Sequence, residues 1–251
     1  MEKGKVAVIT GGSRGIGRST ALQLAQRGVG VILTYKTGAQ EAETAVAEIK
    51  EKNGKAVALP LDLTNIESFD DFAKAVSQSL KKEWNRETFD YLVNNGGSAQ
   101  RTPIANTTEE EFDKLTKEHF KGPFFLTQKL IPLMADGGHV INISSALTRF
   151  THNAGVATYA ALKSALEVFT MYIAHEFAPR RIRANIVAPG ALDTEFGGGR
   201  TDMVRKMIAE RTMLGRIGDA DDIGLLIAGL LSEDSRWVNA QRIEATGGLL
   251  V

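Results

Sequence analysis

Short apolar segments alternate with longer amphipathic segments along the whole chain. The apolar segments are rich in Val, Ile and Leu and lack polar alternation, which is typical of parallel strands covered on both faces. This pattern predicts strands at residues 5–10, 30–35, 56–60, 91–94, 139–144, 183–187 and 241–244. The periodicity between them predicts helices at residues 16–27, 39–52, 66–82, 109–134, 157–177 and 220–231.

Repeated alternation of strand and helix predicts a single α/β domain over residues 1–251. We expect a doubly wound parallel sheet of about seven strands with helices on both faces. The segment from Pro189 to about Asp202 is irregular and contains Gly197-Gly198-Gly199. Because glycines are costly to order, we expect a mobile substrate lid around residues 190–213.

Composition narrows the class of protein. The 30 basic and 30 acidic residues cancel, so the chain lacks the basic balance that nucleic-acid binding requires. The absence of cysteine excludes disulfides and thiolate nucleophiles, and His139, His152 and His175 show no metal-ligand spacing. No apolar segment reaches the ~18 residues of a membrane span, and the N-terminus does not read as a signal peptide. We therefore expect a cytoplasmic protein without a metal.

The first predicted strand ends in a glycine-rich turn that opens the first predicted helix. The turn reads Thr10-Gly11-Gly12-Ser13-Arg14-Gly15-Ile16-Gly17. Such a turn brings backbone N–H groups and a helix N-terminus onto a pyrophosphate, and its glycines stand where a Cβ would obstruct. A glycine cluster alone also fits an ordinary strand-to-helix turn. Its position between the first strand and a helix favours a dinucleotide site.

The end of the second predicted strand bears on which dinucleotide is bound. It reads Thr34-Tyr35-Lys36-Thr37 and contains no acid, although an acid here would hold the ribose hydroxyls of NAD. Arg14 and Lys36 can instead pair with a 2′-phosphate. NADP(H) is thus favoured over NAD, the alternative being that both cations are solvated surface charges.

Tyr159 and Lys163 are four residues apart in a predicted helix, so both side chains lie on one face. A nearby ammonium lowers the pKa of a phenol from ~10 toward neutrality. Tyr159 can then act as general acid in carbonyl reduction and as general base in alcohol oxidation. The pair alone is weak evidence, since an amphipathic helix with a snorkelling lysine also contains it.

Together these motifs resemble the short-chain dehydrogenase/reductase family, most closely its bacterial 3-oxoacyl-ACP reductase-like branch. Besides the glycine turn, Tyr159 and Lys163, the matches are Asp62, Asn94-Asn95-Gly96-Gly97, Ser144-Ser145, Asn185, Pro189-Gly190 and Gly247-Gly248. The resemblance covers essentially the whole chain. It implies a Rossmann fold and an NADP-dependent oxidoreductase that moves hydride between nicotinamide and a small carbonyl or alcohol substrate. It also implies a homo-oligomer, a tetramer or a dimer.

The resemblance also assigns site residues. On the cofactor they are Gly11, Ser13, Arg14, Gly15, Ile16, Gly17, Tyr35, Lys36, Asp62, Leu63, Asn94, Gly96, Tyr159, Lys163, Pro189, Gly190, Leu192 and Thr194. Ser145 is the serine that bonds the substrate oxygen, with Ser144 or Thr148 as the alternative. We expect the substrate to contact residues 100–102, 146–153 and 192–213, including the apolar side chains of Phe150, Phe196 and Met203.

One departure from the family lies at His119, where relatives have an asparagine whose backbone carbonyl helps to bind a relay water near the lysine. Pro123, four residues on, has no N–H, so the carbonyl of His119 lacks its helical partner and can bind the same water. The imidazole can add a group that titrates near neutral pH. The opposing interpretation is an impaired site, which would make the chain a dinucleotide-binding sensor or regulatory protein on the same fold.

Overall fold

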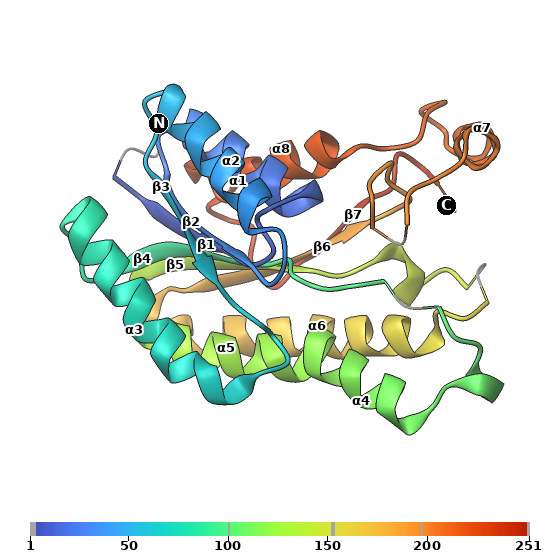
Figure 1. Ribbon diagram of the computed structural model, residues 1–251, viewed down its shortest axis with the longest axis horizontal. Helices are drawn as coiled ribbons and strands as arrows, with labels where there is room; N and C mark the ends of the chain where they lie inside the picture. The colour runs from blue at the N-terminus through green and yellow to red at the C-terminus, as the bar shows by residue number, and fades with distance from the viewer. Residues whose placement is uncertain (1–3, 100, 152–153, 197, 250–251) are drawn as a thin grey trace.

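The computed structural model describes residues 4–99, 101–151, 154–196 and 198–249. Within these residues, seven parallel strands form one sheet in the order β3-β2-β1-β4-β5-β6-β7 (Figure 1). The strands are β1 (Val6–Ile9), β2 (Gly30–Tyr35), β3 (Ala56–Pro60), β4 (Phe89–Asn94), β5 (Met134–Ile143), β6 (Arg183–Pro189) and β7 (Arg242–Ala245). The predicted doubly wound sheet is thus confirmed.

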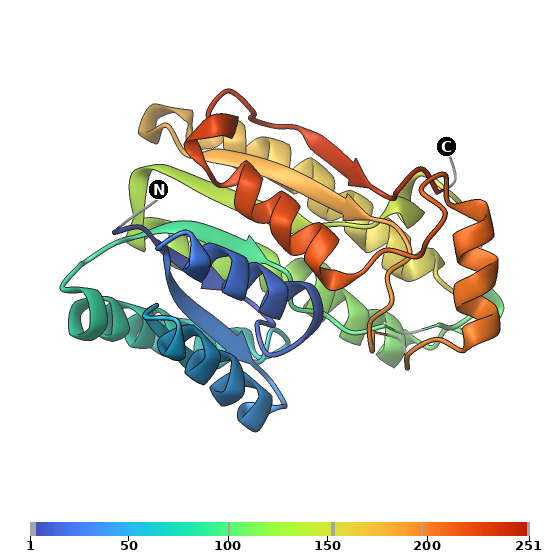
Figure 2. The same cartoon turned by 90° about the horizontal axis from the view of Figure 1, so that it is seen from above.

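Helices cover both faces of the sheet (Figures 1 and 2). Three of them, α1 (Gly15–Gln26), α2 (Ala39–Glu51) and α8 (Ala220–Leu230), pack on one face. The opposite face carries α3 (Phe69–Ser79), α5 (Gly122–Leu130) and α6 (Ala157–Glu176). The chain also contains α4 (Glu109–Thr116), which leads into α5, and α7 (Asp202–Arg211), which lies beyond the ends of β6 and β7.

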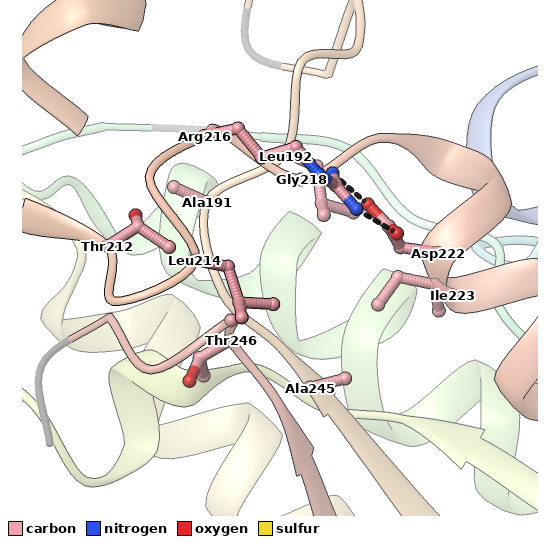
Figure 3. A pocket seen from close by; sticks show the side chains of 11 residues that line it. Ala191, Leu192, Thr212, Leu214, Arg216, Gly218, Asp222, Ile223, Ala245 and Thr246 are labelled. Carbon is pink, nitrogen blue, oxygen red and sulfur yellow. Dashed lines mark hydrogen bonds and ion pairs between the residues drawn. The ribbon is translucent and has the colours of Figure 1, made fainter. Parts of the chain in front are cut away.

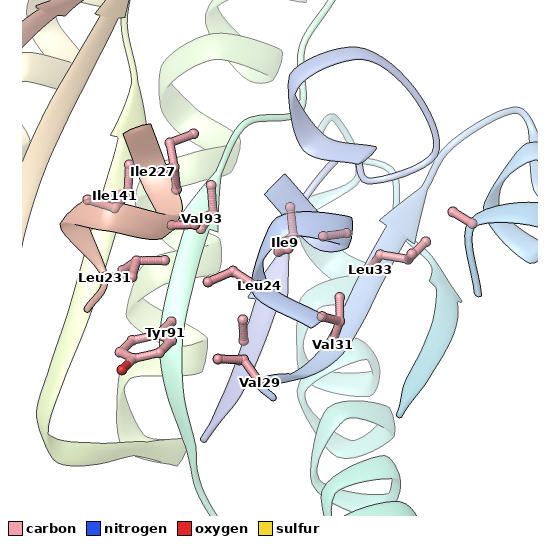
Figure 4. Packing of buried hydrophobic residues seen from close by; sticks show 14 of the residues in the cluster. Ile9, Leu24, Val29, Val31, Leu33, Tyr91, Val93, Ile141, Ile227 and Leu231 are labelled. Atoms are coloured by element: carbon pink, nitrogen blue, oxygen red, sulfur yellow. The ribbon is translucent and has the colours of Figure 1, made fainter. Parts of the chain in front are cut away.

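Central strand β1 shows why the strand segments contain no polar alternation. Val6 and Val8 face the cluster under α3, α5 and α6, whereas Ala7 and Ile9 face the cluster under α1, α2 and α8. All four are 0% exposed. Figure 4 shows Ile9 with the second of these clusters. Both faces are buried, so every position is apolar.

The strand order also fixes where a ligand can bind. The chain passes from β1 outward to β2 and β3, then returns to the other side of β1 with β4. Loops after β1 and β4 therefore leave the sheet in opposite directions and open a crevice at the carboxyl ends of the strands. The glycine turn, the Asn94-Asn95 segment and Ser144-Ser145 all follow strands at this edge.

The predicted helix over residues 109–134 is wrong in two respects. A π-helical turn, η4 (Lys117–Lys121), separates α4 from α5, and the N–H of Gly122 donates to the carbonyl of Lys117 five residues earlier. Pro123 has no N–H to continue an α-helical ladder, which accounts for the irregularity. The predicted end is also wrong, because Met134 begins β5 and pairs with Phe89.

Two other elements differ from the prediction. The helix predicted at residues 66–82 begins as a 3₁₀ turn at Ile66–Ser68 and ends in a π-helical turn at Leu80–Trp84. Helix α7 follows the glycine-rich stretch and was not predicted; its N-cap, Thr201, accepts a hydrogen bond from the N–H of Val204. No helix in the described residues has the length and apolar character that crossing a bilayer requires.

Candidate active site

The glycine turn after β1 packs against the turn after β4. Gly11 has φ +65°, and a Cβ on it would lie 2.9 Å from the Cα of Gly96. A Cβ on Gly17 would lie 2.3 Å from the carbonyl oxygen of Gly11. The side chain of Asn95 donates to the carbonyl of Thr10 at 2.9 Å, while Thr10 Oγ1 accepts from the N–H groups of Asn95 and Gly96. These contacts leave no space for side chains at Gly11 and Gly17.

The N-terminus of α1 has the features of an anion site. Its N-cap, Arg14, is extended and gives no side-chain capping hydrogen bond, and no acidic residue stands in the first turn. A Cβ on Gly15 would meet nothing within 4 Å, so the turn is open on this side. Uncapped N–H groups and the positive end of the helix dipole favour a phosphate here. The residues present therefore fit the diphosphate of a dinucleotide.

The two candidate 2′-phosphate ligands differ in their surroundings. Arg14 is exposed to solvent, whereas Lys36 Nζ lies 3.0 Å from Asp62 Oδ2. Although burial raises the pKa of Asp62, hydrogen bonds from the N–H and hydroxyl of Thr64 and the Lys36 ammonium lower it below its ordinary value. Both Lys36 and Asp62 are partly exposed, so their ion pair contributes at most about 1 kcal/mol. Lys36 can leave it for a phosphate at small cost.

On the predicted adenosine side, the side chain of Asn94 is turned into the protein. Its amide donates to Asn142 Oδ1 at 2.8 Å and to Thr127 Oγ1 at 3.0 Å, and the residue is 4% exposed. A ribose contact from Asn94 must therefore come from its backbone. Gly96 faces Leu63: a Cβ there would lie 2.9 Å from Leu63 Cδ1, which is the end of a flexible side chain.

Tyr159 and Lys163 come from one face of α6 and meet the end of β5, as the sequence predicts. Lys163 is 5% exposed, and its Nζ donates to the carbonyl of Ile143 at 2.7 Å. The Tyr159 phenol shares a hydrogen bond with Ser145, and its ring centroid lies 5.8 Å from Lys163 Nζ. The structure thus brings Ser145, Tyr159 and Lys163 together.

In the protein without cofactor, the prediction that the pKa of Tyr159 is lowered toward neutrality is wrong. Burial raises the pKa of Tyr159 to about 12, and the hydrogen bond from Ser145 offsets only part of this. Burial also lowers the pKa of Lys163 to about 8, against the raising effect of the Glu118 carboxylate. The ammonium is bonded to a carbonyl rather than to the phenol, so desolvation dominates for both groups.

His119 lies in the π-helical turn η4 and is 1% exposed. Its ring packs edge-on against Tyr159, with 5.1 Å between centroids, and its Nε2 lies 2.9 Å from the carbonyl oxygen of Ser98. A carbonyl only accepts, so Nε2 carries the proton. Burial, helped by the charge of Lys163, lowers the pKa of His119 to about 3. The expectation of a near-neutral titrating imidazole is therefore wrong.

Sequence reasoning missed the residues that hold this imidazole. A Cβ on Gly97 would lie 2.6 Å from His119 Cε1, so the ring occupies space that only glycine leaves. The hydroxyl of Ser98 donates to Glu118, which stands beside His119 in the chain. His119 Nδ1 has no hydrogen-bond partner among the described residues. The contact between Gly97 and His119 leaves no periodic pattern in the sequence, because only the fold brings these two residues together.

On the predicted nicotinamide side, Pro189 ends β6, and a Cβ on Gly190 would lie 2.9 Å from the Cα of Thr246. Leu192 pairs with Gly218 in an isolated parallel bridge. Thr194 Oγ1 accepts from the N–H of Phe196 at 3.4 Å. These contacts hold the start of the segment that leads to α7.

Two hollows border the predicted substrate region. A cavity of about 130 Å³ lies between the segment after β6 and the loop after β7, with an Arg216–Asp222 ion pair at its rim (Figure 3). A wider hollow of about 640 Å³ is lined by Ser98, Ala99, Thr108, Glu110, Glu111 and Lys114. Neither is lined by Tyr159 or Ser145, so the catalytic geometry rather than a cavity marks the candidate site.

Of the apolar side chains expected to contact the substrate, Phe196 lies beside Tyr159. The Phe196 ring centroid is 6.4 Å from that of Tyr159, and Phe150 is partly buried. Met203 is 79% exposed. Gln100, His152 and Asn153 lie outside the described residues. In the described part of the chain, no cluster of His, Asp and Glu side chains could hold a metal ion.

Comparison with known proteins places this architecture in a family. The family model described as enoyl-(acyl carrier protein) reductase matches residues 11–250. An uncharacterized oxidoreductase of Methylorubrum extorquens is 35% identical, with 98% of each chain covered. The tetrahydroxynaphthalene reductase PfmaG of Pestalotiopsis fici is 31% identical, with 98% of this chain and 91% of PfmaG covered. The solved structure of the angucycline C-6 ketoreductase LanV with bound NADP is 34% identical with a TM-score of 0.93, and the match covers 99% of this chain and 96% of LanV.

These matches run over nearly the full length of the chain, and the TM-score to LanV shows that the two proteins share their fold. The chain belongs to the short-chain dehydrogenase/reductase family of oxidoreductases.

Proposed function

We propose that this protein is an NADPH-dependent ketoreductase in which Tyr159 donates the proton to the carbonyl oxygen. The observation that carries the proposal is the convergence of Ser145, Tyr159 and Lys163 at the carboxyl end of β5. A proton donor, a hydrogen-bonding hydroxyl and a buried cation are the groups that a carbonyl needs as negative charge develops on its oxygen.

The cofactor proposal rests on the geometry of the glycine turn and on two cations. Residues Gly11 to Gly17 and the N-terminus of α1 would hold the diphosphate, and Arg14 and Lys36 would hold the 2′-phosphate. Bound NADPH supplies the hydride. LanV and a short-chain dehydrogenase of Burkholderia cenocepacia, both similar to this chain, were solved with NADP.

The protein's own groups divide the proton chemistry. Ser145 donates a hydrogen bond to the substrate oxygen, and Tyr159 delivers the proton to it. The Lys163 ammonium stabilises the phenolate left behind. We infer that the carbonyl of His119, whose α-helical partner would be the N–H that Pro123 lacks, binds the water that returns the proton. The imidazole stays neutral, because its pKa is lowered to about 3.

The substrate class that fits best is an apolar ketone. Phe196, at 6.4 Å from Tyr159, lies at the start of a segment rich in exposed apolar side chains, including Met203, Met207 and Met213. Methionines adapt to flat or irregular apolar surfaces. Relatives include a tetrahydroxynaphthalene reductase and an angucycline ketoreductase, which supports aromatic ketones as the first substrates to test.

The test is a panel of bicyclic aromatic ketones, aliphatic β-keto thioesters and an enoyl thioester, with NADPH and NADH consumption followed in parallel. We expect turnover of ketones with NADPH and a loss of about 10²–10⁴-fold in kcat for Tyr159→Phe. Wild-type turnover in Tyr159→Phe would refute the proposed mechanism. Tight NADPH binding without turnover of any compound would support a dinucleotide-binding sensor instead.

A further inference from the structure

Helix α6 carries a third polar side chain, Glu167, on the same face as Tyr159 and Lys163. Glu167 follows Lys163 by four residues, so the three side chains lie one above another. Each meets one of three consecutive residues at the end of β5: Lys163 bonds the Ile143 carbonyl, Glu167 the Ser144 hydroxyl and Tyr159 the Ser145 hydroxyl. Two of these contacts belong to the proposed chemistry. The role of Glu167 is open.

Glu167 is linked to the edge strand of the sheet through Arg242. The Arg242 Nε lies 3.0 Å from Glu167 Oε1, and the side chains are 9% and 17% exposed. The same carboxylate oxygen accepts from the hydroxyls of Ser144, at 2.5 Å, and Thr148, at 3.0 Å. Arg242 also pairs with Glu244 at 2.6 Å. An ion pair with this burial and this many hydrogen bonds is held in one geometry, unlike a surface pair.

The network ends on the backbone of Ser145. Arg242 Nη2 donates to the Ser145 carbonyl at 3.3 Å and to Thr148 Oγ1 at 2.8 Å. The Thr148 hydroxyl lies 3.0 Å from the Ser145 carbonyl as well as from Glu167 Oε1, so its single proton is shared between these two acceptors. On its other side, Ser145 Oγ accepts from the N–H of Leu147 at 3.2 Å and caps the 3₁₀ turn η6 (Ala146–Thr148). Ser145 is thus held both by its carbonyl and by its hydroxyl.

We propose that Glu167 and Arg242 are positioning residues that fix Ser145 for the substrate oxygen. This inference rests on the proposed function of Ser145. Neither side chain touches the reacting atoms; each acts through the backbone of Ser145 and the hydroxyl of Thr148. Misplacement of a catalytic group by about 1 Å can cost 10²-fold in rate, so loss of this support should reach kcat.

Arg180 provides a matched control at the amino end of β5, the end opposite to Ser145. Arg180 pairs with Asp136 at 2.9 Å and donates to the carbonyls of Ile131 and Met134, at the amino end of β5. Arg180→Met removes the same kind of support from β5 far from Ser145. It reports what the loss of a strand-anchoring arginine does to the protein in general.

The experiment compares Arg242→Met, Glu167→Gln and Arg180→Met, each in the wild-type and the Ser145→Ala background. NADPH affinity, kcat, KM for the ketone and thermal unfolding are measured for every variant. We expect Arg242→Met and Glu167→Gln to lower kcat by about 10- to 100-fold with NADPH affinity unchanged. In Ser145→Ala they should have almost no further effect on kcat, because the group they position is gone. Arg180→Met should lower the unfolding temperature and leave kcat near the wild-type value.

Equal losses of kcat in both backgrounds, or an equal loss in Arg180→Met, would overturn the proposal. Arg242→Lys, which keeps the charge, covers the case in which Arg242→Met does not fold, and it should restore part of kcat. Amide hydrogen exchange provides a readout without turnover: residues 144–151 should exchange faster in Arg242→Met but not in Arg180→Met. Unchanged exchange there would refute positioning, whereas absent turnover in the wild type would refute only the proposed function.

Discussion

The two ends of the candidate site are built in opposite ways. At the glycine turn, Gly11 and Gly17 have no side chains, which allows backbone segments to pack directly against each other. The cations Arg14 and Lys36 lie at the surface. At the end of β5 the protein buries polar side chains instead. Lys163, His119 and Ser145 are all less than 9% exposed, and burial is the largest cause of the lowered pKa values of Lys163 and His119.

The difference decides what kind of change each end tolerates. The glycine turn depends on close backbone contacts, so a methyl group added there should weaken cofactor binding. Loss of Arg14 or Lys36 should only reduce the preference for NADPH over NADH. The reacting end depends on protonation, so removal of a charge should abolish chemistry while the fold persists. Substitutions at the two ends can separate these effects.

The largest effect is expected from Lys163→Met. Loss of the buried ammonium should lower kcat by about 10²–10⁴-fold, since no cation then stabilises the Tyr159 phenolate. The folded pKa of Lys163 is about 8 and its ordinary value 10.5. Between these values the unfolded chain binds more protons, so the free energy of unfolding of the wild type should rise with pH. Urea unfolding at pH 7.5 and 10 should show that Lys163→Met lacks this rise; a variant with the same rise would contradict the assignment.

Gly17→Ala should have the next largest effect. The new Cβ would lie 2.3 Å from the carbonyl oxygen of Gly11, and backbone must move. We expect a loss of about 1–3 kcal/mol in the free energy of unfolding and a rise of about tenfold or more in the NADPH Kd. In Gly229→Ala, the control in α8, the Cβ meets nothing within 4 Å. That variant should gain about 0.5–1 kcal/mol and bind NADPH as the wild type does. Similar changes in stability and in NADPH Kd for both glycines would show that Gly17 is not needed for space.

Arg14→Ala and Lys36→Ala should act on cofactor choice and not on the fold. A hydrogen bond between charged groups contributes about 1.5–3 kcal/mol, so each change should reduce the ratio of kcat/KM for NADPH over NADH by about tenfold or more. Lys50→Ala, an exposed lysine on α2, is the control. If the ratio stays constant in both variants, these cations are solvated surface charges.

The smallest effect on kcat is expected from His119→Asn. The folded protein does not protonate His119 until about pH 3, whereas the unfolded chain does so near 6.5. The unfolded state therefore binds more protons in this window, and the free energy of unfolding falls as pH drops. In the variant, the free energy of unfolding should fall with pH less steeply than in the wild type, by about 1.4 kcal/mol per pH unit. A pH dependence due to His139 remains, because the pKa of His139 is also lowered to about 3.

Exposed His175 on α6 gives the control variant, His175→Asn, which should keep the wild-type slope. The kcat of His119→Asn should stay near that of the wild type if the backbone carbonyl is the part that serves the relay. A collapse of kcat would assign a role to the imidazole itself.

Much of this architecture could be predicted from the sequence. Apolar strands and a glycine turn at the end of the first strand are local patterns, and they gave the sheet and the nucleotide end. Tyr159 and Lys163 share a helix face, so their meeting is also local. The break at η4 was less accessible, because Pro123 shows where an α-helix is disturbed but not that a π-helical turn absorbs it.

The protonation states were beyond the sequence for a different reason. Whether an ammonium lowers the pKa of a phenol depends on what else each group contacts, and here Lys163 is bonded to the carbonyl of Ile143. Likewise, the pKa of His119 is lowered to about 3 by burial, and the residues that enclose its ring, Gly97 and Tyr159, are distant from it in the chain. The contact between Arg242 and Ser145 joins residues separated by 97 positions, which no spacing rule reports.

The contact between Gly97 and His119 also constrains how this protein can evolve or be redesigned. A side chain at position 97 would strike an imidazole already held by Ser98 and Tyr159, so the position is closed to substitution while histidine stands at 119. A smaller residue at 119 would release it. Substitution at position 97 therefore depends on the residue at position 119. Libraries that vary residue 97 alone and are selected for folded protein should return only glycine. Libraries that first shorten residue 119 should also recover alanine and serine at position 97.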